Sequence, residues 1–340
     1  MNAEHDPAFD RAHGALLGLA IGDALGMPTQ SMPRDLVRAR YGRIEDFVDG
    51  AADQPIAPGM AAGSVTDDTD QAMIVARLVA DGDGGIDPHA FAAELIAWEQ
   101  VMVERGSLDL LGPSTNAALA KLQAGAPIEE TGRYGTTNGA AMRIAPVGIA
   151  HTPGERLLDA VVEASRVTHN TGLGISAAAA IAAAVSAGVD GADVPGALAA
   201  AATAARDGES RGHWVAGGSI AARLESFRAQ ARRLGTAEFA TFLYEVVGTS
   251  VQSQESVVAA LLLVERGADD PFAALCTAAS LGGDTDTVAA MAGAVLGAVH
   301  GAAAFPAAAV HRVLAVNALE PAPLARRLLA VRRSSTEMMR

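Results

Sequence analysis

Cysteine, aromatic residues and net positive charge are all scarce in this chain. Its 340 residues include a single cysteine, Cys276, which excludes an intramolecular disulfide and a cysteine-ligated zinc cluster. Cys276 lies in an apolar run, so a buried inert thiol is favoured over a catalytic nucleophile. The formal net charge of −14 lacks the basic footprint of a nucleic-acid-binding protein and disfavours an anionic membrane as a partner.

Apolar runs of the kind that export or anchor a protein are also missing. Residues 1–11 are polar and contain no apolar core of a secretory signal. The apolar stretch 175–187 is too short and too rich in alanine for us to expect it to span a bilayer. We therefore expect a cytoplasmic protein without nucleic-acid or membrane partners, either a monomer or a small homo-oligomer.

Apolar residues nevertheless make up half of the chain, with only 4% aromatic. Small side chains let helices approach closely, and helical periodicity recurs from end to end, for example over 138–150 and 215–234. Alternation typical of strands is rare. We predict one all-α domain over residues 12–333, flanked by an N-terminal tail, 1–11, and a C-terminal tail, 334–340.

Two acidic clusters far apart in the chain, Thr66–Asp70 and Asp284–Thr287, stand out from this background. Each follows a glycine-containing turn and precedes a helical stretch, and each taken alone is typical of a helix N-cap. Together they would bring five carboxylates to one place, where like charges raise one another's pKa unless a cation is present. Oxygen ligands suit Mg²⁺, Mn²⁺ or Ca²⁺. Neither cluster has the spacing of an EF-hand, and the glycine turn before Asp284 disfavours a phosphatase with an aspartate nucleophile after a strand.

Five segments, taken in order, resemble the ADP-ribosylglycohydrolase family, which includes dinitrogenase-reductase-activating glycohydrolases and ADP-ribosyl-acceptor hydrolases. They extend over most of the chain, and the last is especially specific because small residues follow it. The segments are 14–26 (GALLGLAIGDALG), 66–69 (TDDT), 138–143 (NGAAMR), 168–170 (THN) and 281–287 (LGGDTDT).

The resemblance implies a compact orthogonal helical bundle with two divalent cations, Mg²⁺ or Mn²⁺. Such cations would bind ribose hydroxyls and lower the pKa of a water that attacks C1 of the ribose. Asp67 or Asp284 would then take the proton of that water. The ligands that the resemblance assigns to this chain are Thr66, Asp67, Asp68, Asp284, Asp286 and Thr287.

One position departs from the family pattern. Many members carry a glutamate a few residues after the first segment, where this chain has Gln30. An amide can orient a water or ligate weakly through oxygen, but it cannot act as a general base. Gln30 is therefore either a weakened catalytic residue, a sign of a different substrate, or a polar residue without a role. The loop 110–115 also lacks an acidic residue that some bacterial relatives have there, although Asp109 lies close.

Several further residues are candidates for contact with the substrate. Asn138 and Gly139 open a helix and would either approach a substrate phosphate or simply cap that helix. Tyr134 is placed to stack on adenine. His169 would serve either as a hydrogen-bonding group at a helix end or as an acid. Arg143 would pair with a phosphate or with an aspartate.

We predict a metal-dependent hydrolase that cleaves an N- or O-glycosidic bond to (ADP-)ribose in a small molecule or a modified protein. Gln30 keeps two alternatives open. One is a nucleoside or ribosyl-nucleotide N-glycosidase. The other is a catalytically silent protein that binds a ligand of the ADP-ribose type.

Overall fold

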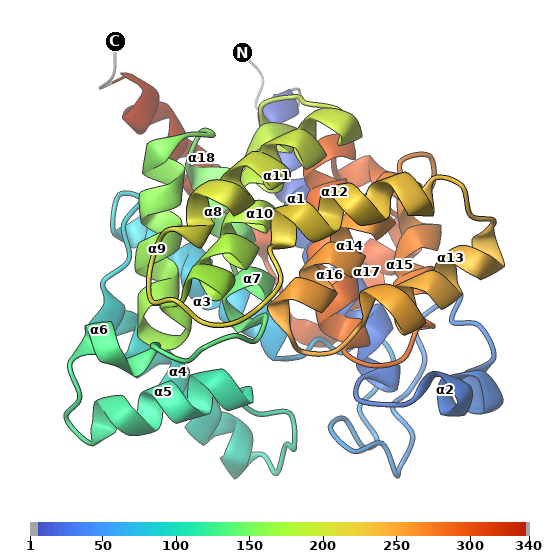
Figure 1. The fold of residues 1–340 in the computed structure, drawn as a ribbon. Coiled ribbons are helices and arrows are strands. Elements are labelled where there is room, and N and C mark those ends of the chain that lie inside the picture. The colour runs from blue at the N-terminus through green and yellow to red at the C-terminus, as the bar shows by residue number, and fades with distance from the viewer. Residues whose placement is uncertain (1–5, 338–340) are drawn as a thin grey trace.

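The computed structural model describes residues 6–337, and helices follow one another through most of this range (Figure 1). Within it, extended backbone pairs only in isolated bridges and not in strands, which confirms the predicted all-α class. The elements are α1 (Pro7–Gly26), η2 (Met27–Thr29), α2 (Arg34–Tyr41), α3 (Asp67–Asp81), α4 (Pro88–Glu104), α5 (Pro113–Gln123), α6 (Ile128–Thr131), α7 (Gly139–Met142), α8 (Ala145–Ala150), α9 (Glu155–His169), α10 (Gly172–Val189), α11 (Val194–Glu209), α12 (Ile220–Ala231), α13 (Thr236–Phe242), η3 (Leu243–Val247), α14 (Ser253–Arg266), α15 (Pro271–Ala279), α16 (Thr285–His300), η4 (Ala302–Ala304), α17 (Ala307–Asn317) and α18 (Pro321–Glu337).

Helices α1 and α16 form the centre of the bundle (Figure 1). They run antiparallel with their backbones in contact, because glycines recur every fourth residue of α1 and face small residues of α16. A Cβ atom placed on Gly18 would lie 2.1 Å from the carbonyl oxygen of Gly293, and one on Gly26 would lie 2.4 Å from the Cα of Asp286. This close approach brings the C-terminal end of α1 against the acidic N-terminus of α16.

Helix α10 is the second core element, and all eighteen of its residues are buried. It is long and apolar enough to cross a membrane by length and composition, whereas the sequence suggested a shorter stretch. Here α8, α9, α11 and α16 pack around it. Its alanines therefore serve close helix packing inside the fold.

The helices differ from the sequence prediction at several boundaries. The stretch 138–150 is two short helices, α7 and α8, because Pro146 lacks an N–H and lies in the first turn of a new helix instead of continuing the old one. The stretch 215–234 narrows to α12, which begins after two glycines with Ser219 as its N-cap. The break between α7 and α8 places Arg143 just beyond α7, which matters for the site below.

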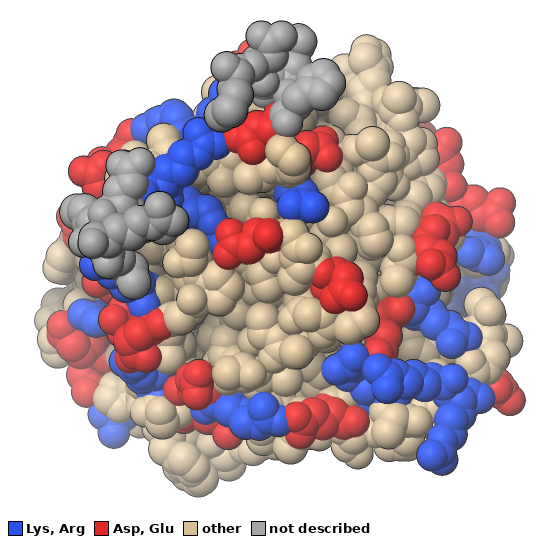
Figure 2. Space-filling view, turned by 90° about the horizontal axis from the view of Figure 1, so that it is seen from above, with Lys and Arg blue, Asp and Glu red and all other residues tan. Residues whose placement is uncertain are grey.

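Both predicted tails overlap helices. Helix α1 begins at Pro7, where the Asp6 carboxylate accepts a hydrogen bond from the Ala8 N–H as an N-cap. Helix α18 extends to Glu337. The remainder of the predicted tails, 1–5 and 338–340, lies outside the described residues. On the face shown in Figure 2, acidic and basic side chains are interspersed around a largely uncharged middle that carries only isolated charged side chains.

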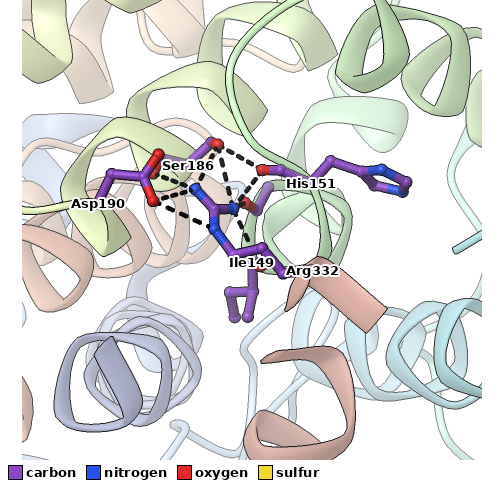
Figure 3. Close-up of polar contacts among 6 residues, drawn as sticks. Ile149, His151, Ser186, Asp190 and Arg332 are labelled. Atoms are coloured by element: carbon purple, nitrogen blue, oxygen red, sulfur yellow. Dashed lines mark hydrogen bonds and ion pairs between the residues drawn. The ribbon is translucent and has the colours of Figure 1, made fainter. Parts of the chain in front are cut away.

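A buried arginine attaches α18 to the rest of the bundle (Figure 3). The Arg332 guanidinium donates to the carbonyl oxygens of Ile149 and His151 at the end of α8, and to the carbonyl oxygen of Ser186 in the last turn of α10. It also pairs with Asp190 at 2.7 Å. One cation therefore satisfies carbonyl groups at two helix C-termini, where the helix dipoles favour positive charge.

Candidate metal centre

The two acidic clusters meet at the N-termini of α3 and α16. The Thr287 hydroxyl donates to Asp68 Oδ2 across 3.1 Å, which joins the clusters directly. Asp68 and Asp286 are 1% and 2% exposed. The convergence that the sequence predicted is therefore present in the fold.

Membership of the cluster differs from the sequence prediction at two positions. Asp70 is turned away, because its carboxylate accepts a hydrogen bond of 2.9 Å from the Trp98 indole N–H on α4. Asp109, from the loop before α5, takes a place in the cluster instead and accepts a hydrogen bond from the backbone N–H of Asp67. The only signal for Asp109 in the sequence was its closeness to the loop 110–115. Such a loop carries no periodicity, so nothing in the pattern shows which way it folds.

Asp23, on α1, binds the start of α3 and so holds the first acidic cluster in place. Its carboxylate accepts hydrogen bonds from the backbone N–H groups and from the hydroxyls of both Thr66 and Thr69. These bonds satisfy the start of α3, so Asp23 acts as a cap from another helix. They also direct the Thr66 hydroxyl proton toward Asp23; the hydroxyl oxygen accepts a long bond from the Asp68 N–H, and one lone pair remains for another partner.

Two fully buried carboxylate oxygens in the cluster have no hydrogen-bond partner among the described residues, namely Oδ1 of Asp68 and Oδ1 of Asp286. Burial, followed by the charge of Asp286, raises the pKa of Asp68 well above its usual value. Burial, followed by the charge of Asp284, does the same to the pKa of Asp286. Unpartnered buried carboxylate oxygens are costly unless protons or cations balance them.

The donor set fits hard divalent cations, since it consists of carboxylates and threonine hydroxyls. Within residues 6–337, however, no three His, Cys, Asp or Glu side chains are already gathered closely enough to form a metal cage. Threonine hydroxyls, which are not among those side chains, complete the donor set, and the buried Oδ1 atoms of Asp68 and Asp286 lack hydrogen-bond partners among the described residues. The residues present therefore match cation binding in chemistry, without showing a preformed coordination sphere.

Neutral amides hold the carboxylates at the edge of the cluster. The Gln71 amide donates to Asp67 Oδ2 at 2.7 Å. The Asn138 amide donates to Asp284 Oδ2 and to the Ser256 hydroxyl. Because an amide carries no charge, it orients a carboxylate without neutralising it. Burial raises the pKa of Asp284 to about 6, and the hydrogen bond from Asn138 acts against that rise.

A pocket of about 260 Å³ opens beside the cluster. Several carboxylates line it, and so do exposed apolar side chains such as Leu108 and Val251. Its polar lining is given by Gln30, Ser31, Asp67, Asp109, Thr115, Thr137, Asn138, Asp284, Asp286 and Thr287. A ligand with several hydroxyl groups on a compact ring would match a pocket of this size and polarity.

Gln30 lines this pocket and is 6% exposed, with its Nε2 lacking a partner among the described residues. Its backbone carbonyl accepts from the Gln54 amide, which anchors the turn after η2. Of the predicted substrate contacts, Asn138 and Gly139 also line the pocket. Gln30 is therefore placed at the site and is not a remote surface residue.

The other two predicted substrate contacts do not line the pocket. Tyr134 is 69% exposed, and its ring lies 4.8 Å below the Lys121 ammonium. His169 is fully buried behind Gly139, where a Cβ on that glycine would lie 2.9 Å from the imidazole. Sequence reasoning placed His169 near the site because it lies in the segment 168–170, and Tyr134 because it lies just before the segment 138–143, but position along the chain does not determine which way a side chain points.

Comparison with known proteins identifies the fold and its relatives. The model of the ADP-ribosylglycohydrolase family matches residues 4–337. The chain is 35% identical over 286 residues to the uncharacterised protein YegU of Escherichia coli, covering 83% of this chain and 85% of that protein. It is 29% identical over 296 residues to the ADP-ribosylarginine hydrolase Tri1 of Pseudomonas putida, covering 85% of this chain and 70% of that protein.

A solved structure shows the same architecture. It is described as an ADP-ribosylglycohydrolase-related protein complex and is 26% identical to this chain. The superposition has a TM-score of 0.67 and covers 96% of this chain and 98% of that one. The orthogonal helical bundle implied by the sequence resemblance is thereby confirmed.

Proposed function

This chain belongs to the ADP-ribosylglycohydrolase family, and from that premise we propose a metal-dependent hydrolase that cleaves the glycosidic bond between ADP-ribose and its acceptor. The family and the names of its relatives support hydrolysis of ADP-ribosyl linkages in general. The involvement of cations and the roles of individual residues are our proposal.

The unpartnered Oδ1 atoms of Asp68 and Asp286 carry this proposal, because they lie in one buried cluster that opens on a pocket. We assign cation binding to Thr66, Asp67, Asp68, Asp284, Asp286 and Thr287. When bound, two Mg²⁺ or Mn²⁺ ions would offset the carboxylate charges, bind ribose hydroxyls and make a water more acidic.

The chain's own groups supply the proton acceptor and the orientation. Hydrolysis forms a bond from the water oxygen to C1 of the ribose and breaks the bond from C1 to the acceptor nitrogen or oxygen. A carboxylate takes one water proton, the other stays on the new C1 hydroxyl, and the proton taken from the water balances the one that the leaving group gains. Asp67 and Asp284 line the pocket and are each held by an amide, so either can accept that proton.

Gln30 favours a second candidate, a silent protein that binds an ADP-ribose-type ligand. A neutral amide at the pocket wall can donate to a ligand oxygen but cannot take a proton from water. Against this, Asp109 supplies an additional carboxylate to the same pocket. We therefore place the enzyme first.

The deciding experiment compares turnover in matched aspartate variants. Purified protein is incubated with Mg²⁺ or Mn²⁺ and with peptides that carry ADP-ribosyl-arginine or ADP-ribosyl-serine, beside free nucleosides. We expect turnover to be lost in Asp67→Asn and in Asp284→Asn and kept in Asp70→Asn, because Asp70 faces Trp98 and not the cluster.

Other outcomes would favour the alternatives. Tight binding of ADP-ribose by the wild-type chain without turnover would identify the silent binder. Ribose release from nucleosides, with none from the modified peptides, would identify an N-glycosidase. Equal loss of activity in Asp70→Asn would mean that the variants act through stability, and thermal melts of all three would reveal this.

A further inference from the structure

A chain of buried hydrogen bonds runs behind the pocket from Arg143 to Thr137, and we call it the Arg143–Thr137 relay. Arg143 Nη2 lies 2.6 Å from Thr168 Oγ1, which lies 2.8 Å from His169 Nδ1. His169 Nε2 lies 2.9 Å from Thr137 Oγ1. Arg143, Thr168 and His169 are at most 1% exposed, whereas Thr137 lines the pocket.

The direction of this relay follows from its first member. A guanidinium is always a donor and never an acceptor. Thr168 Oγ1 therefore accepts from Arg143, and its only other hydrogen-bond partner among the described residues is His169 Nδ1. The buried Thr168 proton accordingly goes to Nδ1, because an unpaired buried hydroxyl proton would be unfavourable.

The next step depends on the protonation of His169. Burial, followed by the charge of Arg143, keeps the pKa of His169 well below its usual value, so the imidazole is neutral. A neutral imidazole with a bare Nδ1 carries its proton on Nε2. Nε2 therefore donates to Thr137 Oγ1. The described residues offer the Thr137 hydroxyl no acceptor of its own, and its proton is free to point into the pocket.

We propose that Thr137 is a substrate-contacting residue whose hydroxyl always donates, and that Arg143, Thr168 and His169 are positioning residues which impose this direction. The ligand group would be an oxygen acceptor, such as a phosphoryl or ribose oxygen. A fixed donor has particular value here, because carboxylates, which are acceptors, also line the pocket. The identity of the ligand rests on the proposed function, but the direction of the relay does not.

Arg143 serves both sides of the site. Its Nη1 donates to the Gln71 amide oxygen at 2.6 Å, and the Gln71 amide in turn donates to Asp67. Gln71 thus links the Arg143 guanidinium to the Asp67 carboxylate through two hydrogen bonds. The guanidinium also lies 4.8 Å from the centre of the Phe91 ring. The break between α7 and α8 makes this possible, since Arg143 sits at the C-cap of α7.

The first test reads the tautomer of His169 without any substrate. Two-bond proton–nitrogen NMR spectra distinguish a protonated ring nitrogen from a bare one, and a His169→Asn spectrum assigns the signal among the eight histidines. We expect protonated Nε2 and bare Nδ1 in the wild-type chain. In Arg143→Met, Thr168 is free to accept from Nδ1, so we expect a mixture of tautomers.

Arg332→Met is the matched control. It also removes a buried arginine, but Arg332 binds the backbone carbonyl oxygens of Ile149 and Ser186 and takes no part in the relay. We expect the wild-type tautomer there. A protonated Nδ1 in the wild-type chain, or an unchanged tautomer in Arg143→Met, would overturn the relay. Arg143→Lys, which keeps an obligate donor, provides a second variant if Arg143→Met is poorly folded, and should keep the wild-type tautomer.

The second test measures the affinity for ADP-ribose by calorimetry at a fixed Mg²⁺ concentration. Removal of one hydrogen bond in Thr137→Val should weaken binding by about three- to tenfold, and Thr137→Ser should restore it. Thr168→Val, which breaks the relay but leaves the bond from Arg143 to Gln71, should also weaken binding, and the double variant should bind no worse than Thr137→Val. Equal affinity of Thr137→Val and wild type would refute the contact. A wild-type chain that neither binds nor cleaves ADP-ribosyl compounds would sink the proposed function, while the tautomer would still decide the relay.

Discussion

Replacement of Gly22 by alanine gives the sharpest test of how this fold holds its site. Gly22 lies in the interior of α1, one residue before Asp23. A Cβ there would lie 2.1 Å from the carbonyl oxygen of Ala289 and 2.4 Å from its carbonyl carbon, both backbone atoms of α16. Because backbone cannot rotate away as a side chain can, the two helices would have to separate.

Two effects of opposite sign compete in this variant. Alanine is the better helix former by about 1 kcal/mol, so α1 considered alone would be stabilised. Moving the Cβ from 2.1 Å to an ordinary contact of about 3.4 Å, however, requires a shift of about 1.3 Å between two core helices. Overpacking of this kind costs about 1–3 kcal/mol and occasionally more. Since the obstacle is backbone, we expect the upper end of that range and a net loss of about 2 kcal/mol.

Urea denaturation followed by circular dichroism measures this difference. Gly196→Ala on α11 is the matched control, because its nearest atoms belong to the side chains of Asp193 and Ala192 at 3.1 and 3.2 Å. We expect that control to be neutral or slightly more stable than wild type. A Gly22→Ala chain that is as stable as wild type would refute the argument from close backbone contact.

Two further predictions concern the charges. In Asp286→Asn, the stability without cations should rise, because burial and the charge of Asp284 disfavour the Asp286 carboxylate. The stabilisation by added Mg²⁺ or Mn²⁺, about 2.7 kcal/mol for the wild-type chain at one hundred times Kd, should be smaller in this variant. Thermal melts with and without cation measure both effects, and an equal response of the two chains would contradict the prediction. Burial lowers the pKa of His151, so the folded chain binds fewer protons at this residue than the unfolded chain, and the resulting stabilisation is complete above pH 6.5 and is lost as the pH falls. Between pH 7.5 and 5.5, His151→Gln should therefore lose less stability than wild type in urea titrations. Equal losses in the two chains would show the inference to be mistaken.

Much of the fold and site could be predicted because it depends on local chemistry. Alanine-rich helical periodicity is a property of neighbouring residues, and so are the Asp and Thr residues that begin α3 and α16. The break after α7 was missed although Pro146 is visible in the sequence, because the apolar pattern continues across it. The boundaries of the predicted tails were misplaced for a similar reason, since polar composition alone does not show that Asp6 caps a helix.

Other features depend on contacts between distant segments. The sequence placed Asp70 in the cluster, but the indole of Trp98 on α4 draws it away. It left Asp109 outside, but the loop before α5 folds onto the N–H of Asp67. His169 lies within a motif and Tyr134 lies just before one, yet His169 is buried behind the pocket and Tyr134 is exposed. The spacing of residues along the chain cannot determine which of several neighbouring side chains will form a contact with a distant segment.

By itself, the sequence determined the all-α class, the two acidic clusters, the family and the departure at Gln30, because each depends on residue type and short-range spacing. Tertiary structure alone decided that glycines of α1 bring α16 into backbone contact, that Asp109 joins the cluster in place of Asp70, and that Arg143 controls a donor at the pocket wall. The physical reason is that these three features arise from close packing and buried hydrogen bonds between segments that meet only after the bundle has folded.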